Sequence, residues 1–600
     1  MSDVVDQPSE EPAVSSDGSA KVSRSFFQAD LVSRPAALCL GLTMVLALAA
    51  RLLVSICLHP LRIGWDPALH LMCAALICQG KLPYVDMFDV NPPLIWYINT
   101  LPASLAAFFN APLPLSFNLF LLFLIALAGL LSAYVIVEKL PRRDLFVNFG
   151  VLFGLLFFNF FLTVDFGQRE EIFVLLFTPF AFFRMARWQG EKLNLSLAII
   201  FGLVGAVGIF MKHYFVLNFV FFELFCCFYY RLKAFRRAQF LTLLKPLLAP
   251  EILTIGCLGL AYLAHFFFLP AAVRHNYFDF LVPAFARGYY FWDTSVTNCI
   301  ATPYKRDIFL IFTACGALAL GLVRFYPVFG WLVSFGLASV VVYLMQFKGW
   351  AYQDIPVTAA AYMIAWGLVG ALVSLLVTRL SPSTFGQGRQ EKGCSAKSFS
   401  SPATIAAYGL ALLLAGSCLF TARDEITLTA GFPSFDMALL GYRGTTPMMD
   451  IEGPFTESIL KNSKTDDPIV FISNAVAPGF PITMQLRRRA GSRHLHVCIL
   501  SVLQYIRSGS VRDVETKRLL DYDPLVVKEL GEDILKNKPP LVYLQEAPIK
   551  NDYFLPYDFV KRYLYRYKEV EPIINFSVYK LENPDAPAPV LPPLSRNEVK

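Results

Sequence analysis

The residues best suited to chemistry in this 600-residue chain are acids and cations that stand just outside long apolar segments. Asp66, Asp86 and Asp89 follow the first such segment, together with Lys81 and His70. A carboxylate can accept a proton from a hydroxyl group, and a lysine can hold a phosphate leaving group. Ionisable groups beside a lipid bilayer are costly unless they are paired or line a wet cavity, so their concentration here indicates a site.

Each of these acids also has a purely structural interpretation. Asp66 precedes Pro67, an order typical of a helix cap followed by the first helical residue, and this role is compatible with catalysis. Asp86 and Asp89 could instead form hydrogen bonds within a turn. We therefore take Asp66 as the candidate catalytic residue, and Asp86 and Asp89 as candidate substrate-binding residues.

A second polar segment, residues 165–171, is enclosed by two very apolar segments. Asp165, Arg169 and Glu170 must share a polar cavity there or neutralise one another. An ion pair of Arg169 with either acid would be purely structural, so both interpretations stay open. Asp165 and Glu170 could bind sugar hydroxyls or a divalent metal, and the sequence does not choose between these ligands.

Two later segments bring further cations and aromatic residues. Lys212 could snorkel to the membrane interface, and Trp350 and Tyr352, which follow Lys348, could be ordinary interfacial aromatics. What favours a site is convergence: four polar segments, separated by long apolar ones, each carry an acid or a cation on the same predicted membrane face. One cavity could collect them.

The composition is that of a membrane protein. Hydrophobic residues make up 56% of the chain and charged residues only 16%, and the mean hydropathy is +0.52. The net charge of +7 is spread over short clusters between apolar segments, as topology signals are, which argues against nucleic-acid binding. The 12 cysteines show neither a CxxC pair nor a Cys/His metal spacing. Residues 1–35 are predicted to be a disordered cytoplasmic tail without a cleaved signal peptide.

Runs of roughly 20 apolar residues predict transmembrane helices. Eleven occur, at residues 36–58, 115–137, 145–163, 172–187, 193–211, 214–230, 249–270, 307–322, 326–346, 355–378 and 403–421. A twelfth run, residues 93–109, is short and begins after two prolines. If it does not cross, the Lys/Arg clusters fall on the cytoplasmic side, so we predict a helix along the outer interface, within an external loop of residues 59–114.

The odd number of spans places residues 422–600 outside the cytoplasm, after a transmembrane module of residues 36–421. Short apolar, β-rich runs at residues 469–472, 541–544 and 576–581 alternate there with polar helical stretches at residues 511–520 and 525–535. This pattern predicts a small extracytoplasmic α/β domain. It contains no nucleophile elbow, P-loop or GxGxxG motif, so an accessory or acceptor-facing role is expected.

In residues 36–380 the sequence resembles the GT-C superfamily of membrane glycosyltransferases, which includes dolichyl-phosphate-mannose protein mannosyltransferases and bacterial aminoarabinose transferases. The resemblance is carried by Asp66, Gly80-Lys81-Leu82-Pro83-Tyr84-Val85-Asp86, Asn91-Pro92-Pro93-Leu94, Gly167-Gln168-Arg169-Glu170 and Gly349-Trp350-Ala351-Tyr352. It implies that Asp66 is the base that deprotonates the acceptor and that Lys81 contacts the lipid phosphate. The chain differs at Pro67, where mannosyltransferases commonly carry a second acid, and at Gln353, where bacterial relatives often have His.

The resemblance implies a GT-C-like fold and an extracytoplasmic enzyme. It would transfer a monosaccharide from a polyprenyl-phosphate donor to a glycan, lipid or protein acceptor, in one displacement with inversion, and no nucleotide-sugar site or cofactor is required. Arg169 and Lys348 would help Lys81 to stabilise the departing phosphate. Candidate substrate-binding residues are Asp86, Asp89, Asp165, Glu170 and Tyr352. The expected location is a bacterial inner membrane, with the N-terminus in the cytoplasm.

Two other classes of function stay open. A secondary transporter or a lipid-linked-sugar flippase would show internal repeats and polar groups near the membrane midplane, whereas the polar groups here lie at the ends of the apolar runs. A non-catalytic membrane subunit of an envelope glycan assembly would instead present the C-terminal domain to a partner. Alanine at Asp66 and Lys81 would leave cellular glycans unchanged in that case.

Overall fold

A computed structural model describes residues 34–58, 63–162, 165–235, 245–380, 449–509 and 513–592, together with the single positions 409 and 416. The predicted tail, residues 1–35, lies almost wholly outside these ranges. The predicted span at residues 403–421 lies outside them except for the two single positions, and so does the predicted start of the C-terminal domain at residue 422.

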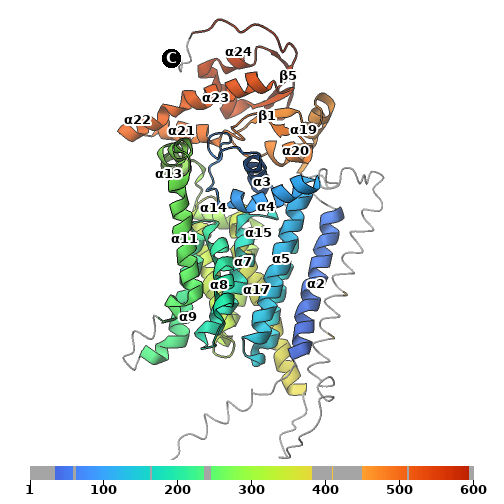
Figure 1. The fold of residues 1–600 in the computed structure, drawn as a ribbon, viewed down its shortest axis with the longest axis vertical. Coiled ribbons are helices and arrows are strands. Elements are labelled where there is room, and N and C mark those ends of the chain that lie inside the picture. Colours follow the sequence, from blue (N-terminus) through green and yellow to red (C-terminus); the bar gives the residue numbers. More distant parts are fainter. Residues whose placement is uncertain are drawn as a thin grey trace, which may run out of the picture.

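The membrane module is a bundle of long helices with the C-terminal domain at one end (Figure 1). A helix stands at each of the other ten predicted spans. These helices are α2 (Arg34–Leu58), α5 (Leu113–Glu138), α6 (Leu145–Phe157), α7 (Arg169–Trp188), α8 (Leu195–Phe210), α9 (Phe215–Phe235), α11 (Pro250–Phe268), α15 (Pro303–Leu322), α16 (Val328–Met345) and α17 (Ile355–Leu380).

Among the described residues, six segments are long and apolar enough to cross a membrane. They are Arg34–Val54, Leu113–Glu138, Arg142–Phe160, Pro250–Phe268, Val328–Met345 and Ala351–Val377. The helices α7, α8, α9 and α15 run alongside them in the same bundle (Figure 1). The coarse prediction of a helical, polytopic membrane protein is therefore confirmed.

Helix α7 is the core of the bundle. Almost all of its side chains are buried, and it packs against α5, α8, α9 and α17. A helix whose residues are apolar on most faces can be surrounded by other helices. Two arginines of α7 also pair with acids on neighbouring helices. Fully buried Arg184 donates to Glu223 at 2.7 Å and to Glu251 at 2.8 Å, and Arg187 donates to Glu251 at 3.0 Å.

Two short helices lie at the end of the bundle next to the C-terminal domain (Figure 1). Helix α3 (Trp65–Cys78) stands between the bundle and that domain, and it packs against α4 (Leu94–Phe109). Helix α4 covers the ambiguous run at residues 93–109. It is one of the shorter apolar helices rather than one of the six candidate spans.

The other short elements of the bundle connect its helices. They are η1 (Arg142–Asp144), η2 (Phe158–Phe161), η4 (Lys245–Leu248), α12 (Ala271–Arg274), η5 (His275–Leu281), α13 (Val282–Gly288), η6 (Tyr289–Trp292), α14 (Val296–Ala301) and η7 (Ala351–Asp354).

The C-terminal domain is a five-stranded sheet with helices, which confirms its predicted α/β character. The strands are β1 (Pro468–Ile472), β2 (Arg489–Ala490), β3 (Leu541–Gln545), β4 (Tyr567–Ile573) and β5 (Phe576–Leu581), in the order β2-β1-β3-β5-β4. Strand β1 is parallel to β2 and β3, whereas β5 is antiparallel to β3 and β4. The helical elements are α19 (Met449–Asn462), α20 (Gly479–Gln485), α21 (Cys498–Ser508), α22 (Val514–Leu520), α23 (Tyr522–Asn537), η10 (Glu546–Phe554), η11 (Leu555–Tyr557) and α24 (Phe559–Tyr563).

The C-terminal domain is docked to the bundle through η5 and α13. The rings of Phe280 and Tyr522 are stacked with centroids 3.9 Å apart, and Arg287 forms ion pairs with Asp513, at 3.0 Å, and with Glu515. Because α13 also packs along α21, apolar and charged contacts act together to fix the domain over the end of the bundle.

The packing of α6 against α17 gives a test of the bundle. A Cβ atom on Gly154 would lie 2.6 Å from the carbonyl oxygen of Tyr362, so the two backbones must separate if Gly154 becomes alanine. We expect Gly154→Ala to destabilise the detergent-solubilised protein by about 1–3 kcal/mol, measured as a lower midpoint of thermal unfolding. Gly256→Ala on α11 is the control, because no described atom lies within 4 Å of the added carbon. Equal midpoints for the two variants would contradict this packing.

Candidate functional site

Asp66 lies in the first turn of α3 and is half-buried. The residue at the N-cap is Gly64, and no side chain caps the helix. The alternative that Asp66 caps a helix beginning at Pro67 is therefore wrong, because the helix already begins at Trp65. Among the described residues none forms a hydrogen bond or an ion pair with the Asp66 carboxylate.

Arg169 is the first residue of α7 and is buried. Its guanidinium donates to the side-chain oxygen of Asn91 at 2.7 Å, and its Nε has no hydrogen-bond partner. Within the described ranges Arg169 forms no ion pair. The alternative in which Arg169 pairs with Glu170 or Asp165 is therefore wrong. Glu170 has a different partner.

That partner is Lys212, in the short connection between α8 and α9. Lys212 Nζ donates to Glu170 Oε1 and to Gln346 Oε1, both at 2.9 Å, and Gln353 donates to the same Gln346 oxygen at 3.0 Å. Lys212 also lies 5.6 Å from the centre of the Tyr352 ring. Lys212, which from the sequence alone could reach the membrane interface, is thus the centre of a polar network that joins α7, the end of α16 and η7.

The charges of this cluster act on Asp66. Burial raises the pKa of the Asp66 carboxyl above its ordinary value, while the cations of Arg169 and Lys212 oppose the rise and the carboxylates of Asp89 and Glu170 add to it. An acid whose pKa is shifted by burial and by specific neighbours at a partly exposed position is a candidate for proton transfer.

Asp165 borders the same cluster. Burial, together with the charges of Glu170 and Asp66, raises the pKa of Asp165 to about 6. Asp165, Glu170 and Asp66 therefore form an acidic group that the structure brings together. Among the described residues, no three His, Cys, Asp or Glu side chains are arranged as a metal site would require.

Asp89 is buried beside a histidine of the C-terminal domain. Asp89 Oδ1 lies 3.2 Å from His496 Nε2, and Asn91 donates to both Asp89 oxygens, at 3.2 and 3.0 Å. These partners hold the pKa of Asp89 well below its ordinary value against the effect of burial. Sequence reasoning missed His496, because it lies 407 residues from Asp89 and belongs to no motif.

Lys348 and Tyr352 lie near the cluster, but only Lys348 is held by an ion pair of its own. Lys348 is paired with Asp293, donates to the Tyr289 carbonyl oxygen at 2.8 Å and lies 4.1 Å from the centre of the Tyr289 ring. Its charge is already balanced by its own acid. Tyr352 is partly buried and faces Lys212.

Lys81 and Asp86 lie in the exposed turn that follows α3. Asp86 Oδ2 accepts a hydrogen bond from the backbone N–H of Leu82 at 2.8 Å, which is the turn role considered from the sequence. Helix α3 is 14 residues long, so its two ends lie roughly 20 Å apart. Asp66 stands at one end and Lys81 follows the other. The structure does not bring Lys81 to the cluster, and it leaves Asp86 exposed in the turn.

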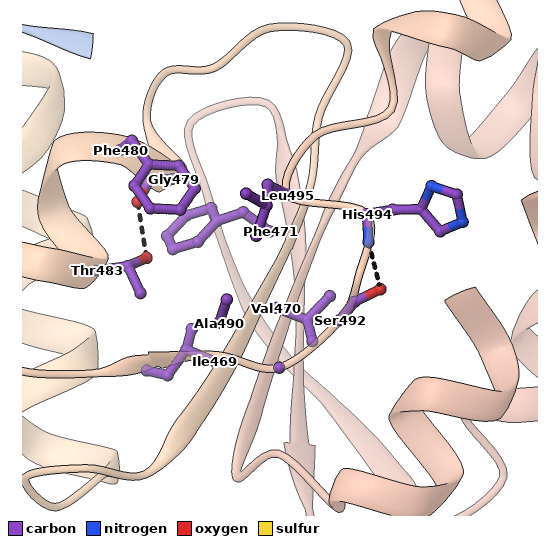
Figure 2. Close-up of a pocket in the computed structure, with 11 residues that line it drawn as sticks. Ile469, Val470, Phe471, Gly479, Phe480, Thr483, Ala490, Ser492, His494 and Leu495 are labelled. Carbon is purple, nitrogen blue, oxygen red and sulfur yellow. Dashed lines mark hydrogen bonds between the residues drawn. The ribbon is translucent and has the colours of Figure 1, made fainter. Parts of the chain in front are cut away.

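A separate cavity lies inside the C-terminal domain, between β1, α20 and the segment that follows β2 (Figure 2). Its volume of about 10 Å³ has room for one water molecule. Figure 2 shows that the His494 side chain points away from Phe471 and Leu495, while its backbone N–H is bonded to Ser492 Oγ at 3.1 Å. This cavity is too small to be a ligand site.

The fold and the cluster define a helical membrane protein with a charged site where its bundle meets a small α/β domain. The chain matches no protein-family model and no curated protein.

The Lys212–Glu170 pair gives a test of the network. Removing the acid leaves a buried lysine unpaired, which typically costs about 3–5 kcal/mol, so we expect Glu170→Ala to lower the thermal midpoint strongly. Burial already lowers the pKa of Lys212, and the loss of Glu170 would lower it further. The unfolded state then binds more protons, so stability rises with pH and the deficit shrinks from pH 6 to pH 9.

The control for this experiment is the double variant Glu170→Leu with Lys212→Met, which removes both charges. It should be more stable than Glu170→Ala alone, because no buried charge is left without a partner. If the two variants unfold at the same temperature at every pH, Lys212 and Glu170 do not interact as the structure has them.

Proposed function

We propose that this protein is a glycosyltransferase that moves a monosaccharide from a polyprenyl-phosphate donor to an acceptor hydroxyl on the extracytoplasmic face. One observation carries the proposal: Asp66 and Arg169, an acid and a guanidinium, meet in one cluster, and neither has an ion-pair partner among the described residues. Opposite charges that act on one another but are not paired are available to a substrate, one as a base and the other as a phosphate-binding group.

In this mechanism, Asp66 accepts the proton of the acceptor hydroxyl as its oxygen attacks the anomeric carbon. The bond between that carbon and the phosphate oxygen breaks, and the phosphate leaves with the electron pair. Arg169 stabilises the charge that develops on the departing phosphate. Attack from the face opposite the phosphate inverts the anomeric centre.

The other predicted residues take supporting roles. Glu170 holds Lys212, and Asp89 holds Asn91 against Arg169. Asp165, which borders the same cluster, is assigned to the sugar hydroxyls. Lys348 is neutralised by Asp293, and Lys81 is separated from Asp66 by the length of α3, so the phosphate is assigned to Arg169 instead.

The proposal includes eleven spans, with the C-terminal domain outside. It is supported by the positions of cations at the other end of the bundle. Arg142 and Arg143 stand in η1, the connection between α5 and α6, and Arg187 stands in the last turn of α7, at the opposite end of that helix from Arg169. Clusters of positive charge in the connections between spans are retained on the cytoplasmic side, so the basic connections at this end favour an outward-facing C-terminal domain.

Asp66→Asn tests the base. We expect membranes that contain this variant to lose about a thousandfold in transfer from a polyprenyl-phosphate sugar, within the range of general-base catalysis. Asp307→Asn is the matched control, because it changes an exposed carboxylate on α15 that lies beside Arg306, and it should keep activity. If Asp66→Asn transfers the sugar at the wild-type rate, the assignment of Asp66 as the base is wrong.

The acidic limb of the pH profile tests the environment of the base. Because burial raises the pKa of Asp66, kcat/KM should fall with decreasing pH through a value above 3.8, the ordinary value for aspartate. Arg169→Gln removes a cation that holds this pKa down, so the limb of the residual activity should move to higher pH. A limb that stays in place in Arg169→Gln would show that another group titrates.

The acceptor is found by comparing surface lipids, glycans and proteins by mass spectrometry with and without the gene. A difference of one sugar supports a transferase. Unchanged glycoconjugates contradict the transferase, and accumulation of the lipid-linked sugar on the cytoplasmic leaflet, with normal transfer in disrupted membranes, would identify a flippase instead.

A further inference from the structure

The C-terminal domain reaches the proposed phosphate-binding residue through a continuous chain of hydrogen bonds. His496 Nε2 lies 3.2 Å from Asp89 Oδ1, Asn91 donates to Asp89 Oδ2 at 3.0 Å, and Arg169 donates to Asn91 Oδ1 at 2.7 Å. All the links are side chains, and His496, Asp89 and Arg169 are buried. The orientation of the Asn91 amide is set by its neighbours, because its NH₂ faces a carboxylate and its oxygen faces a guanidinium.

The loop that carries Asp89 and Asn91 is also held by its backbone. The N–H of Phe88 donates to the Arg493 carbonyl oxygen at 2.7 Å, and the Phe88 ring is stacked on His494 with centroids 4.8 Å apart. The Tyr84 hydroxyl donates to the Asn91 carbonyl oxygen at 2.7 Å. The loop is therefore clamped between the C-terminal domain and the start of α7, so a shift of the domain would move Asn91.

We infer that His496 is a positioning residue: through Asp89 and Asn91 it holds the Arg169 guanidinium where the lipid phosphate binds, so that the C-terminal domain completes the site. This inference rests on the proposed function. It gives the C-terminal domain a role beyond the accessory one expected from the sequence.

The charges along the chain agree with this arrangement. Burial lowers the pKa of His496, but Cys498 and Asp89 outweigh it, so the pKa lies well above its ordinary value. The nearby His70 has the opposite behaviour, because burial and the Arg169 cation lower its pKa to about 3 and keep it neutral. Asp89 is thus balanced by His496, and Arg169 keeps its charge available for a ligand.

The test measures binding of undecaprenyl phosphate, which has no sugar, to the full-length purified protein in detergent. His496→Ala should weaken binding about tenfold, the size expected when a hydrogen bond that orients a charged group is lost. His496→Gln, whose amide can still donate to Asp89, should bind close to the wild type. Asn91→Leu breaks the same chain without touching the C-terminal domain and should reproduce the loss, including where His496→Ala folds poorly.

The matched control is His494→Ala. His494 lies two residues away in the same interface, stacked on Phe88 and 3.0 Å from Glu529, but no hydrogen bond links it to Arg169 in the described structure. It should leave binding near the wild-type value. A loss equal to that of His496→Ala would overturn the inference, since it would show that any loosening of the interface has this effect.

A double-mutant cycle separates this inference from the function on which it rests. If His496 acts through Arg169, then His496→Ala with Arg169→Gln should bind no more weakly than Arg169→Gln alone. Additive losses would overturn the inference and leave the proposed function standing. If the wild type does not bind undecaprenyl phosphate, or if Arg169→Gln binds as well as the wild type, the assignment of the phosphate to Arg169 fails and the inference fails with it.

Discussion

The structure depends on one constraint, which is that charges at the end of an apolar bundle must be balanced without bulk water. An isolated buried charge is far more expensive than most packing defects, and pairing offsets the cost only if the remaining polar atoms are also satisfied. The chain meets this constraint with networks that cross between elements: Lys212 with Glu170 and Gln346, and Asp89 with His496. These networks fix how the helix ends and the C-terminal domain approach one another.

The constraint also explains why the C-terminal domain sits where it does. Asp89 is buried, and its hydrogen-bonding partners include His496, which the folded domain supplies. Around this pair the contact is reinforced by the ring of His494 on Phe88 and by Arg287 with Asp513. Docking of the domain thus gives the buried Asp89 carboxylate a histidine partner in addition to the Asn91 amide.

The sequence predicted the elements with local signals. Apolar runs gave the helices of the bundle and β-rich runs gave β1, β3 and β5, whereas β4 was missed because Lys568, Glu569 and Glu571 give this exposed strand the composition of a loop. The arrangement of the candidate site could be predicted only in part. The structure brings the charges of Asp66, Arg169 and Glu170 near one another, but pairing depends on three-dimensional neighbours, so Glu170 binds Lys212 rather than Arg169. Lys81 follows closely in sequence, yet α3 carries it away from Asp66.

The two ends of α7 show how a structural charge differs from one available for a ligand. Arg184 is fully buried, and its Nε and both terminal nitrogens donate to Glu223 and Glu251, so its bonding capacity is used within the fold. Arg169, on the same helix, has one neutral partner and an Nε without any. A buried guanidinium left in that state costs stability, and its charge stays available to act on Asp66, which has no ion-pair partner among the described residues. The two arginines differ in how many of their N–H groups have hydrogen-bond partners. This difference, rather than the residue type, identifies Arg169 as a candidate site residue.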